Sequence, residues 1–158
     1  FEHKKLYRLP RLREELPEDE YIVEIGKARI AREGRDVSII TFGAQVLTAL
    51  DAAEELEKEG LDVEVIDLRT LAPMDKETIL ASVKKTSRVL ILHEASLTGG
   101  IGGEISAIIS QEAFEWLDAP VVRVASIDTP VPYSPPMEDY YLPQVADVLD
   151  AARKLAAY

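Results

Sequence analysis

The sequence predicts a three-layer α/β/α domain built on a mostly parallel sheet of about five strands. Three observations lead to this fold class. Short runs of β-branched and aliphatic residues recur along the chain, apolar residues at helical spacing follow most of them, and glycines or prolines separate the two patterns. Strands that alternate with helices form βαβ units, whose right-handed crossovers cover both faces of a parallel sheet.

The first half of the chain opens with a charged segment and then takes up this alternation. Residues 1–20 contain two prolines and show no clear period, so we expect an arm or linker from a missing upstream domain, with the α/β domain over residues 21–158. The elements expected next are one or two short strands within 21–32, a buried strand at 37–41, and a helix over about 46–58 that ends at Gly60.

The second half repeats the cycle. Its expected elements are a strand at 63–68, a helix capped by Asp75 and running to about Lys85, a strand at 89–92, a glycine-rich turn at 96–103 leading into a helix with Ile105, Ile108, Ile109 and Trp116 on one face, a strand at 121–125, and a last helix with Pro143 in its first turn. Residues between the last strand and Pro143 are expected to form a proline-rich loop.

Composition limits the classes of partner. The chain has 158 residues, of which 47% are hydrophobic and 30% charged, and it has no cysteine, so disulfides and thiolate chemistry are excluded. No apolar run reaches the roughly 18 residues of a membrane span. With 18 basic and 29 acidic residues the net charge is -11, which disfavours nucleic acid and anionic membranes and favours a basic protein partner. We expect a cytoplasmic protein, or a mitochondrial matrix protein in a eukaryote.

The glycine-rich loop is the strongest ligand-site candidate that the residues alone provide, because it follows a strand and opens a helix, whose N-terminus attracts anions. Ile105 stands where a dinucleotide-binding motif needs its third glycine, and there is no Walker lysine. The Glu104 carboxylate already interacts favourably with the positive end of the helix dipole. Tight turns and close packing are therefore the favoured interpretation. The alternative is a rim for a small anion formed by His93, Gly99, Gly100, Gly102 and Gly103.

His93 ends an apolar strand beside Glu94, so it is either a general base or phosphate contact, or a ring whose hydrogen bond fixes the loop. Without a second nearby histidine or a nucleophile motif, we predict no catalytic residue and no metal site in this chain. Arg123 lies within an apolar strand and is expected to be buried and paired with Asp128 or Asp67.

Several segments taken together resemble one family, the C-terminal domain of thiamine-diphosphate enzymes of the transketolase type, and most closely the beta subunits of 2-oxo acid dehydrogenases. The resemblance covers essentially the whole chain in order. Its segments are 65–75 (VIDLRTLAPMD), 1–8 (FEHKKLYR), 25–28, 32–36, 50–58, 93–95 with the glycine loop, 117–120 (LDAP), 128–133 (DTPVPY) and 141–143.

The resemblance implies a domain that assembles and docks rather than catalyses. In that family the catalytic groups and the thiamine diphosphate and magnesium sites lie in the preceding domain and in the alpha subunit, so this chain is expected to bind no cofactor itself. The implied partners are a second beta subunit, the alpha subunit and, in some members, the basic peripheral subunit-binding domain of the dihydrolipoyl acyltransferase. By the same resemblance, Asp118 and Tyr158 are expected at the docking surface.

Two alternatives remain open at this point. The chain could be the equivalent domain of a transketolase or a deoxyxylulose-phosphate synthase, although residues 6–8 and 117–120 favour the dehydrogenase. It could instead be an independent α/β domain that binds a small anion at the His93 rim.

Overall fold

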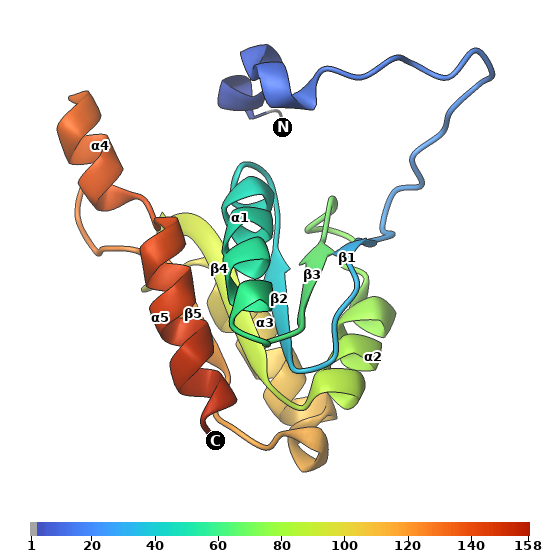
Figure 1. Cartoon of the computed structure of the whole chain (residues 1–158), viewed down its shortest axis with the longest axis vertical. Helices are drawn as coiled ribbons and strands as arrows, with labels where there is room; N and C mark the ends of the chain where they lie inside the picture. The colour runs from blue at the N-terminus through green and yellow to red at the C-terminus, as the bar shows by residue number, and fades with distance from the viewer. Residues whose placement is uncertain (1–2) are drawn as a thin grey trace.

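The computed structural model describes residues 3–158 and confirms the predicted α/β fold (Figure 1). Its sheet has five strands in the order β1-β3-β2-β4-β5. The elements in chain order are η1 (Lys4–Arg8), η2 (Pro10–Leu12), β1 (Arg29–Arg32), β2 (Val37–Thr41), α1 (Gln45–Lys58), β3 (Val63–Asp67), α2 (Lys76–Thr86), β4 (Val89–Ser96), α3 (Ile101–Glu112), η3 (Phe114–Trp116), β5 (Val122–Ser126), α4 (Pro135–Tyr141) and α5 (Val145–Ala156).

The sheet is parallel except at one edge. β2 pairs in parallel with β3 and β4, and β4 pairs in parallel with β5, whereas β1 pairs with β3 in antiparallel register. The chain moves from β2 outward to β3 and then crosses back to β4 on the other side of β2. The direction of winding therefore changes between β2 and β4, which is where open sheets of this kind form a crevice at their carboxyl edge.

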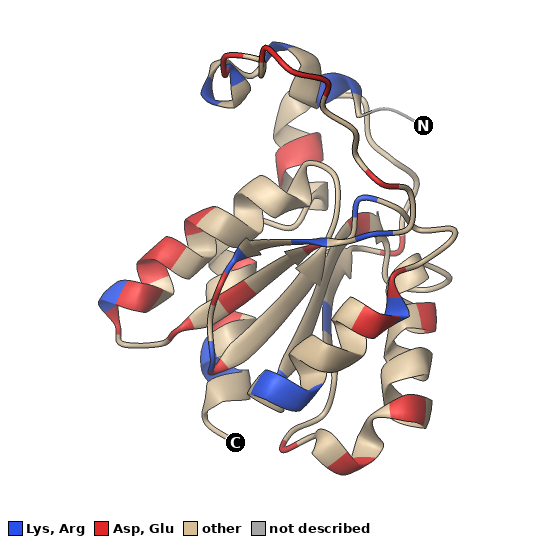
Figure 2. Ribbon diagram, turned by 90° about the vertical axis from the view of Figure 1, so that its right-hand side faces the viewer, with Lys and Arg blue, Asp and Glu red and all other residues tan. Residues whose placement is uncertain are grey.

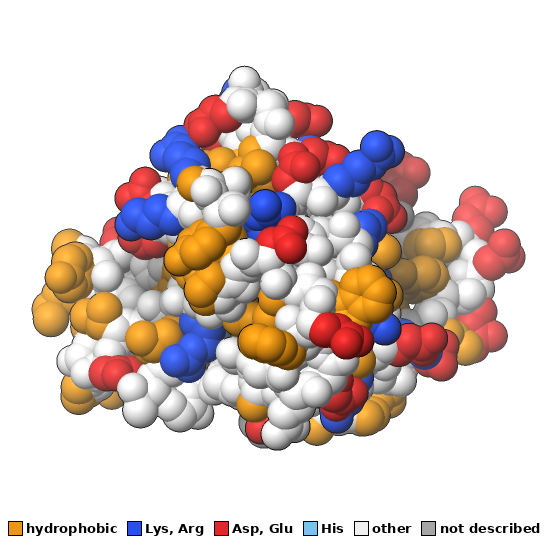
Figure 3. All heavy atoms as spheres, turned by 90° about the horizontal axis from the view of Figure 1, so that it is seen from below, with side chains coloured by type: hydrophobic (Ala, Val, Ile, Leu, Met, Phe, Trp, Pro, Cys, Tyr) orange, Lys and Arg blue, Asp and Glu red, His pale blue; other side chains and the backbone are white. Residues whose placement is uncertain are grey.

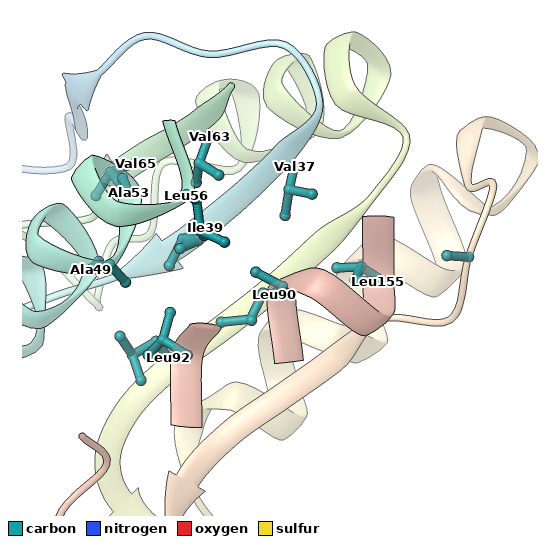
Figure 4. Close-up of a cluster of buried hydrophobic side chains, with 14 residues drawn as sticks. Val37, Ile39, Ala49, Ala53, Leu56, Val63, Val65, Leu90, Leu92 and Leu155 are labelled. Atoms are coloured by element: carbon teal, nitrogen blue, oxygen red, sulfur yellow. The ribbon is translucent and has the colours of Figure 1, made fainter. Parts of the chain in front are cut away.

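Two apolar clusters hold the three layers together, one on each face of the sheet. On one face, side chains of β2, β3 and β4 pack against α1 and α5, with Leu56, Leu92 and Leu155 fully buried (Figure 4). On the other face, α2 and α3 cover the sheet around Ile66 and Ile91. The alternation of strand residues between the two clusters explains why these strands read as continuous apolar runs in the sequence.

The start of α2 shows how local sequence sets an element boundary. Asp75 accepts hydrogen bonds from the Thr78 backbone N at 3.1 Å and from Thr78 Oγ1 at 2.8 Å, as its predicted N-cap role requires. Asp75 also accepts from the Ala28 backbone N at 2.9 Å. The cap therefore ties the segment before β1 to the start of α2.

Three local predictions were wrong. Trp116 does not lie on α3, because the helix ends at Glu112 and Ala113 leaves helical geometry, which places Trp116 in η3. Pro143 precedes the last helix, which begins at Val145 because the Gln144 backbone N donates to the Asp147 carboxylate at 2.8 Å. The expected proline-rich loop contains a helix, α4, of which only Tyr141 is buried.

The N-terminal arm lies over the carboxyl edge of the sheet, above β2 and α1 in Figure 1. The Arg11 guanidinium makes two hydrogen bonds of 2.9 Å with the Asp51 carboxylate on α1, and His3 Nε2 lies 2.9 Å from Glu94 Oε1 on β4. Between the arm and β1 the chain is extended. Residues 1–2, which begin the first segment of the resemblance, lie outside the described residues.

Figure 2 shows acidic residues on several helices and on the arm, so the negative charge is spread over the molecule rather than gathered at one place.

Candidate functional site

The structure brings Asp118 and Tyr158 together in one groove of about 540 Å³. The groove lies at the end of the molecule where the parallel strands begin, beside the C-terminus. Figure 3 looks onto this end and shows apolar side chains exposed among acidic and basic ones. The lining residues are Ser106 and Ser110 of α3, Phe114 of η3, the segment Leu117, Asp118, Ala119, Pro120 and Val121, and Tyr158. We call this the docking groove, after the role that the resemblance implies for Asp118 and Tyr158.

The segment that carries Asp118 is fixed by a backbone hydrogen bond and by packing against the apolar clusters on both faces of the sheet. The Asp118 backbone N donates to the Ser87 carbonyl at 2.9 Å, Leu117 packs against one apolar cluster, and Ala119 is buried in the other. The Asp118 carboxylate nevertheless remains 61% exposed, with the Arg88 guanidinium 3.8 Å away. A fixed backbone therefore presents a charge that is loosely paired and open to a partner.

Aromatic side chains border the docking groove. Phe114 is 74% exposed and Tyr158 is 68% exposed. The Lys84 ammonium group lies over the ring of Trp116 in η3, 5.4 Å from the ring centroid. Sequence reasoning did not single out Phe114. Phe114 falls within the helix that was expected to reach Trp116, so no signal in the sequence marked it as an exposed residue beside the groove.

His93 is fully buried, and its ring stacks near Phe42 with the centroids 6.5 Å apart. Its Nδ1 lies 3.1 Å from the Ala95 carbonyl oxygen, which can only accept, so Nδ1 carries the proton. Burial lowers the pKa of His93 below its ordinary value, and the Ala95 hydrogen bond opposes this only in part. A neutral, enclosed ring fits the interpretation that His93 fixes the loop.

The glycines of this loop accommodate the His93 ring. A Cβ on Gly100 would lie 2.7 Å from His93 Cε1, and a Cβ on Gly102 would lie 2.7 Å from His93 Cδ2. Gly99 adopts a left-handed backbone with φ of +75° in open space, and a Cβ on Gly103 would meet only Arg123 Nη1, at 3.6 Å. This geometry favours close packing over a rim for a small anion.

Arg123 is not buried, which corrects the expectation from its apolar neighbours. β5 is an edge strand, and the Arg123 guanidinium is exposed and donates to the Leu97 carbonyl at 3.0 Å. Neither expected partner forms a hydrogen bond or a close ion pair with it. Asp67 lies 3.7 Å from Arg29, and Asp128 accepts from Thr98 N and Oγ1, which lowers the pKa of Asp128. The charge of Arg123 also helps to lower the pKa of Asp128.

A buried polar network at the amino edge was missed by sequence reasoning. Glu64 of β3 is fully buried. Its carboxylate accepts hydrogen bonds from Lys85 Nζ and from Ser82 Oγ, the latter with 2.5 Å between Ser82 Oγ and Glu64 Oε1. Ser82 in turn lies 2.6 Å from Ser38 Oγ, which is 2.7 Å from Thr86 Oγ1. The only signal in the sequence was a glutamate that interrupts an apolar strand.

Within residues 3–158, no group of three or more histidine or acidic side chains is arranged to hold a metal ion. Among the same residues, no helix is both long and apolar enough to cross a lipid bilayer.

Two known proteins that are similar in sequence to this chain share one description. The chain is 50% identical over 157 residues to the pyruvate dehydrogenase E1 component subunit beta of Bacillus subtilis, covering 99% of this chain and 47% of that protein. It is 48% identical over 153 residues to the subunit of the same name from Staphylococcus aureus strain Mu50, covering 97% of this chain and 46% of that one. The chain therefore spans about half the length of these relatives.

Solved structures share the fold. A split-gene transketolase, described as an inactive beta4 tetramer, superposes with a TM-score of 0.76 at 32% identity, over 85% of this chain and 44% of that one. A transketolase from Pichia stipitis in complex with fructose 6-phosphate superposes with a TM-score of 0.60 at 16% identity, over 84% of this chain and 18% of that one, a likeness of fold alone.

A model of the transketolase C-terminal domain matches residues 26–148, which include the whole sheet and the crevice at its carboxyl edge. The match covers most of the chain and agrees with the full-length similarity to the beta subunits. The chain belongs to the transketolase C-terminal domain family.

Proposed function

We propose that this chain is the assembly and docking domain of the beta subunit of a 2-oxo acid dehydrogenase complex. The parent enzyme would use thiamine diphosphate and magnesium to decarboxylate a 2-oxo acid oxidatively and to acylate the lipoyl groups of an acyltransferase, in a bacterial cytoplasm or a mitochondrial matrix. This chain would contact the alpha subunit and a second beta subunit, and would itself bind no cofactor. The names of the relatives support this assignment.

The observation that carries the docking role is the docking groove itself. Asp118 and Tyr158 are forty residues apart in the sequence and line the same groove, with exposed aromatic surface beside an exposed carboxylate. Interfaces gain most of their affinity from buried aromatic anchors surrounded by a polar rim. The groove offers both parts.

Charge supports a basic partner. A net charge of -11 attracts a basic module from a distance, and Asp118 adds a local site for a lysine or arginine of the partner. The nearby Arg88 does not neutralise Asp118 fully, since 3.8 Å exceeds hydrogen-bond length. The peripheral subunit-binding domain of a dihydrolipoyl acyltransferase is the partner that we propose.

Calorimetric titration of this chain with such a subunit-binding domain, at low and high salt, tests the proposal. We expect binding that weakens with salt and that Asp118→Ala weakens about tenfold or more, because charge pairs at interfaces couple by 1.4 kcal/mol or above, roughly. The matched control is Asp139→Ala on α4, at the opposite end of the molecule, which changes net charge equally and should leave affinity within about twofold.

Two outcomes would count against docking here. Equal losses from Asp118→Ala and Asp139→Ala would mean that only net charge matters, and binding that neither variant changes would place the partner elsewhere. A parallel titration with thiamine diphosphate and magnesium tests the cofactor statement, because tight binding by this chain alone would contradict it.

A further inference from the structure

A second groove, of about 750 Å³, lies at the other end of the sheet. It is lined by Phe42 and Gly43 after β2, by Arg69, Thr70, Leu71 and Ala72 after β3, and by His3 and Leu6 of the N-terminal arm. It lies outside the carboxyl ends of the parallel strands β2 and β3, beside the crevice between β2 and β4, and its volume lies in the usual range of small-molecule sites, about 300–1,000 Å³. We call it the carboxyl-edge groove.

The lining of the carboxyl-edge groove is mainly hydrocarbon. Leu6, Phe42, Leu71 and Ala72 supply apolar surface from three separate segments of the chain. Thr70 Oγ1 accepts a hydrogen bond from the Gly26 backbone N at 3.2 Å, so its hydroxyl remains able to donate. A mostly apolar lining with few polar groups is the common composition of small-molecule sites.

Arg69 provides the charge in this groove. Among residues 3–158, no carboxylate forms an ion pair with its guanidinium, and the nearby Asp67 carboxylate instead accepts from the Arg69 backbone N at 3.2 Å and lies 3.7 Å from Arg29. The other charged partner in the region, Glu94, is bonded to His3. In a chain with 29 acidic and 18 basic residues, an arginine that lines a groove and has no ion-pair partner among the described residues is an available anion contact.

The backbone of Arg69 is also unusual. Its φ is +55°, a left-handed conformation that residues other than glycine rarely adopt and that a protein retains where the surrounding structure requires it. The strained residue is the exposed arginine that lines the groove. Arg69 thus combines a strained backbone with a positive charge that has no ion-pair partner among the described residues.

We propose that the carboxyl-edge groove binds a small organic monocarboxylate, with its carboxylate on Arg69 and Thr70 and its apolar body against Phe42, Leu6 and Leu71. Arginine binds carboxylates through two parallel hydrogen bonds. A dianion such as phosphate fits less well, because one guanidinium would face two charges within a chain of net charge -11. The proposal involves none of the docking-groove residues, so it stands or fails separately from the proposed function.

Titration of the full 158-residue chain with 4-methylpentanoate, followed by calorimetry or NMR, tests this proposal. We expect saturable binding with a Kd on the order of 1 mM, as suits a small ligand. The neutral 4-methylpentanamide and inorganic phosphate should each bind about tenfold more weakly or not at all. Arg69→Met, which keeps the side-chain length, should weaken carboxylate binding by about tenfold or more.

Two further variants keep the result interpretable. Arg69→Gly removes the guanidinium and suits the left-handed backbone, so it should fold well and also lose binding. Arg13→Met removes an exposed charge outside the groove and should leave the affinity within about twofold. Absence of saturable carboxylate binding, equal binding of the amide or of phosphate, or equal effects of Arg69→Met and Arg13→Met would each overturn the proposal.

Discussion

The two edges of the sheet are built differently. At the amino edge, buried hydrogen bonds join β2, β3 and α2 through Glu64 and Ser82, and the Asp118 segment is bonded to the backbone of Ser87. At the carboxyl edge, the contacts of the arm include the Arg11–Asp51 ion pair and the hydrogen bond between His3 and Glu94, all between partly exposed side chains. Buried polar networks are rigid, whereas exposed ion pairs contribute about 0–1 kcal/mol each.

The difference bears on the two grooves. The docking groove lies on backbone that is fixed in the folded domain, which suits the docking role proposed above because a preformed surface loses less entropy on binding. The carboxyl-edge groove includes two arm residues in its wall, His3 and Leu6, so its shape depends on weak contacts. Four predictions test this contrast.

The largest expected effect is at the amino edge. Lys85→Met leaves the fully buried Glu64 carboxylate without its cation, and breaking a buried ion pair costs about 3–5 kcal/mol; we expect about 2–4 kcal/mol here because Lys85 is itself partly exposed. Urea unfolding measures the loss. Lys84→Met, one residue earlier on the same helix, should cost about 1 kcal/mol or less. The double variant Glu64→Gln with Lys85→Met should recover part of the stability, and equal costs for the two lysines would contradict a rigid amino edge.

The next effect concerns the strand end beneath the arm. Gly102→Ala would bring a Cβ to 2.7 Å from His93 Cδ2 and 3.3 Å from Ile91 Cγ2, so we expect a loss of about 1–3 kcal/mol from overpacking. Gly103→Ala is the matched control, since its Cβ meets only Arg123 Nη1 at 3.6 Å and alanine favours a helix by about 0.5–1 kcal/mol. If both variants were stabilising, the His93 ring would not be tightly enclosed.

The third prediction is a pH dependence at the same place. Burial lowers the pKa of His93 in the folded protein, so below about pH 6.5 the unfolded chain binds a proton that the folded chain does not. Stability should therefore fall as the pH drops through this range, by at most about 1.4 kcal/mol per pH unit for one proton. Urea unfolding between about pH 7.5 and about pH 5.5 should show a smaller slope for His93→Gln than for the wild type. Equal slopes would show that the ring is not protected from protonation.

The sequence predicted the fold well because the fold is encoded locally. Apolar runs, helical spacing and the Asp75 cap each arise within a few residues, and the structure confirms them. Trp116 and Arg123 were misplaced because their surroundings depend on where a helix stops and which strand lies at the edge. Those two facts follow from tertiary packing, which periodicity does not contain.

The sites were less visible from the sequence. Asp118 and Tyr158 came from the family resemblance, and the groove that joins them also needs Phe114 and one face of α3. The sequence does not reveal that Arg69 has no ion-pair partner among residues 3–158, because this depends on where the Asp67 and Glu94 carboxylates lie. A groove walled by the arm could not be inferred from either segment alone.

The smallest effect on stability, and the most direct test of the contrast between the edges, comes from the arm. Arg11→Ala removes the double hydrogen bond to Asp51 and should lower the free energy of unfolding by less than about 1 kcal/mol. Arg153→Ala, which removes an equivalent double hydrogen bond between α5 and Glu59, the C-cap of α1, should have a similar global cost.

Hydrogen exchange should separate the two variants. The backbone amides of Leu12 and Arg13, which close η2, should exchange about 2–5-fold faster only in Arg11→Ala, because local opening of the arm requires little free energy. Unchanged exchange would show that the arm is held by contacts other than the Arg11 pair, such as the His3–Glu94 hydrogen bond, and would contradict a weakly held arm at the carboxyl edge.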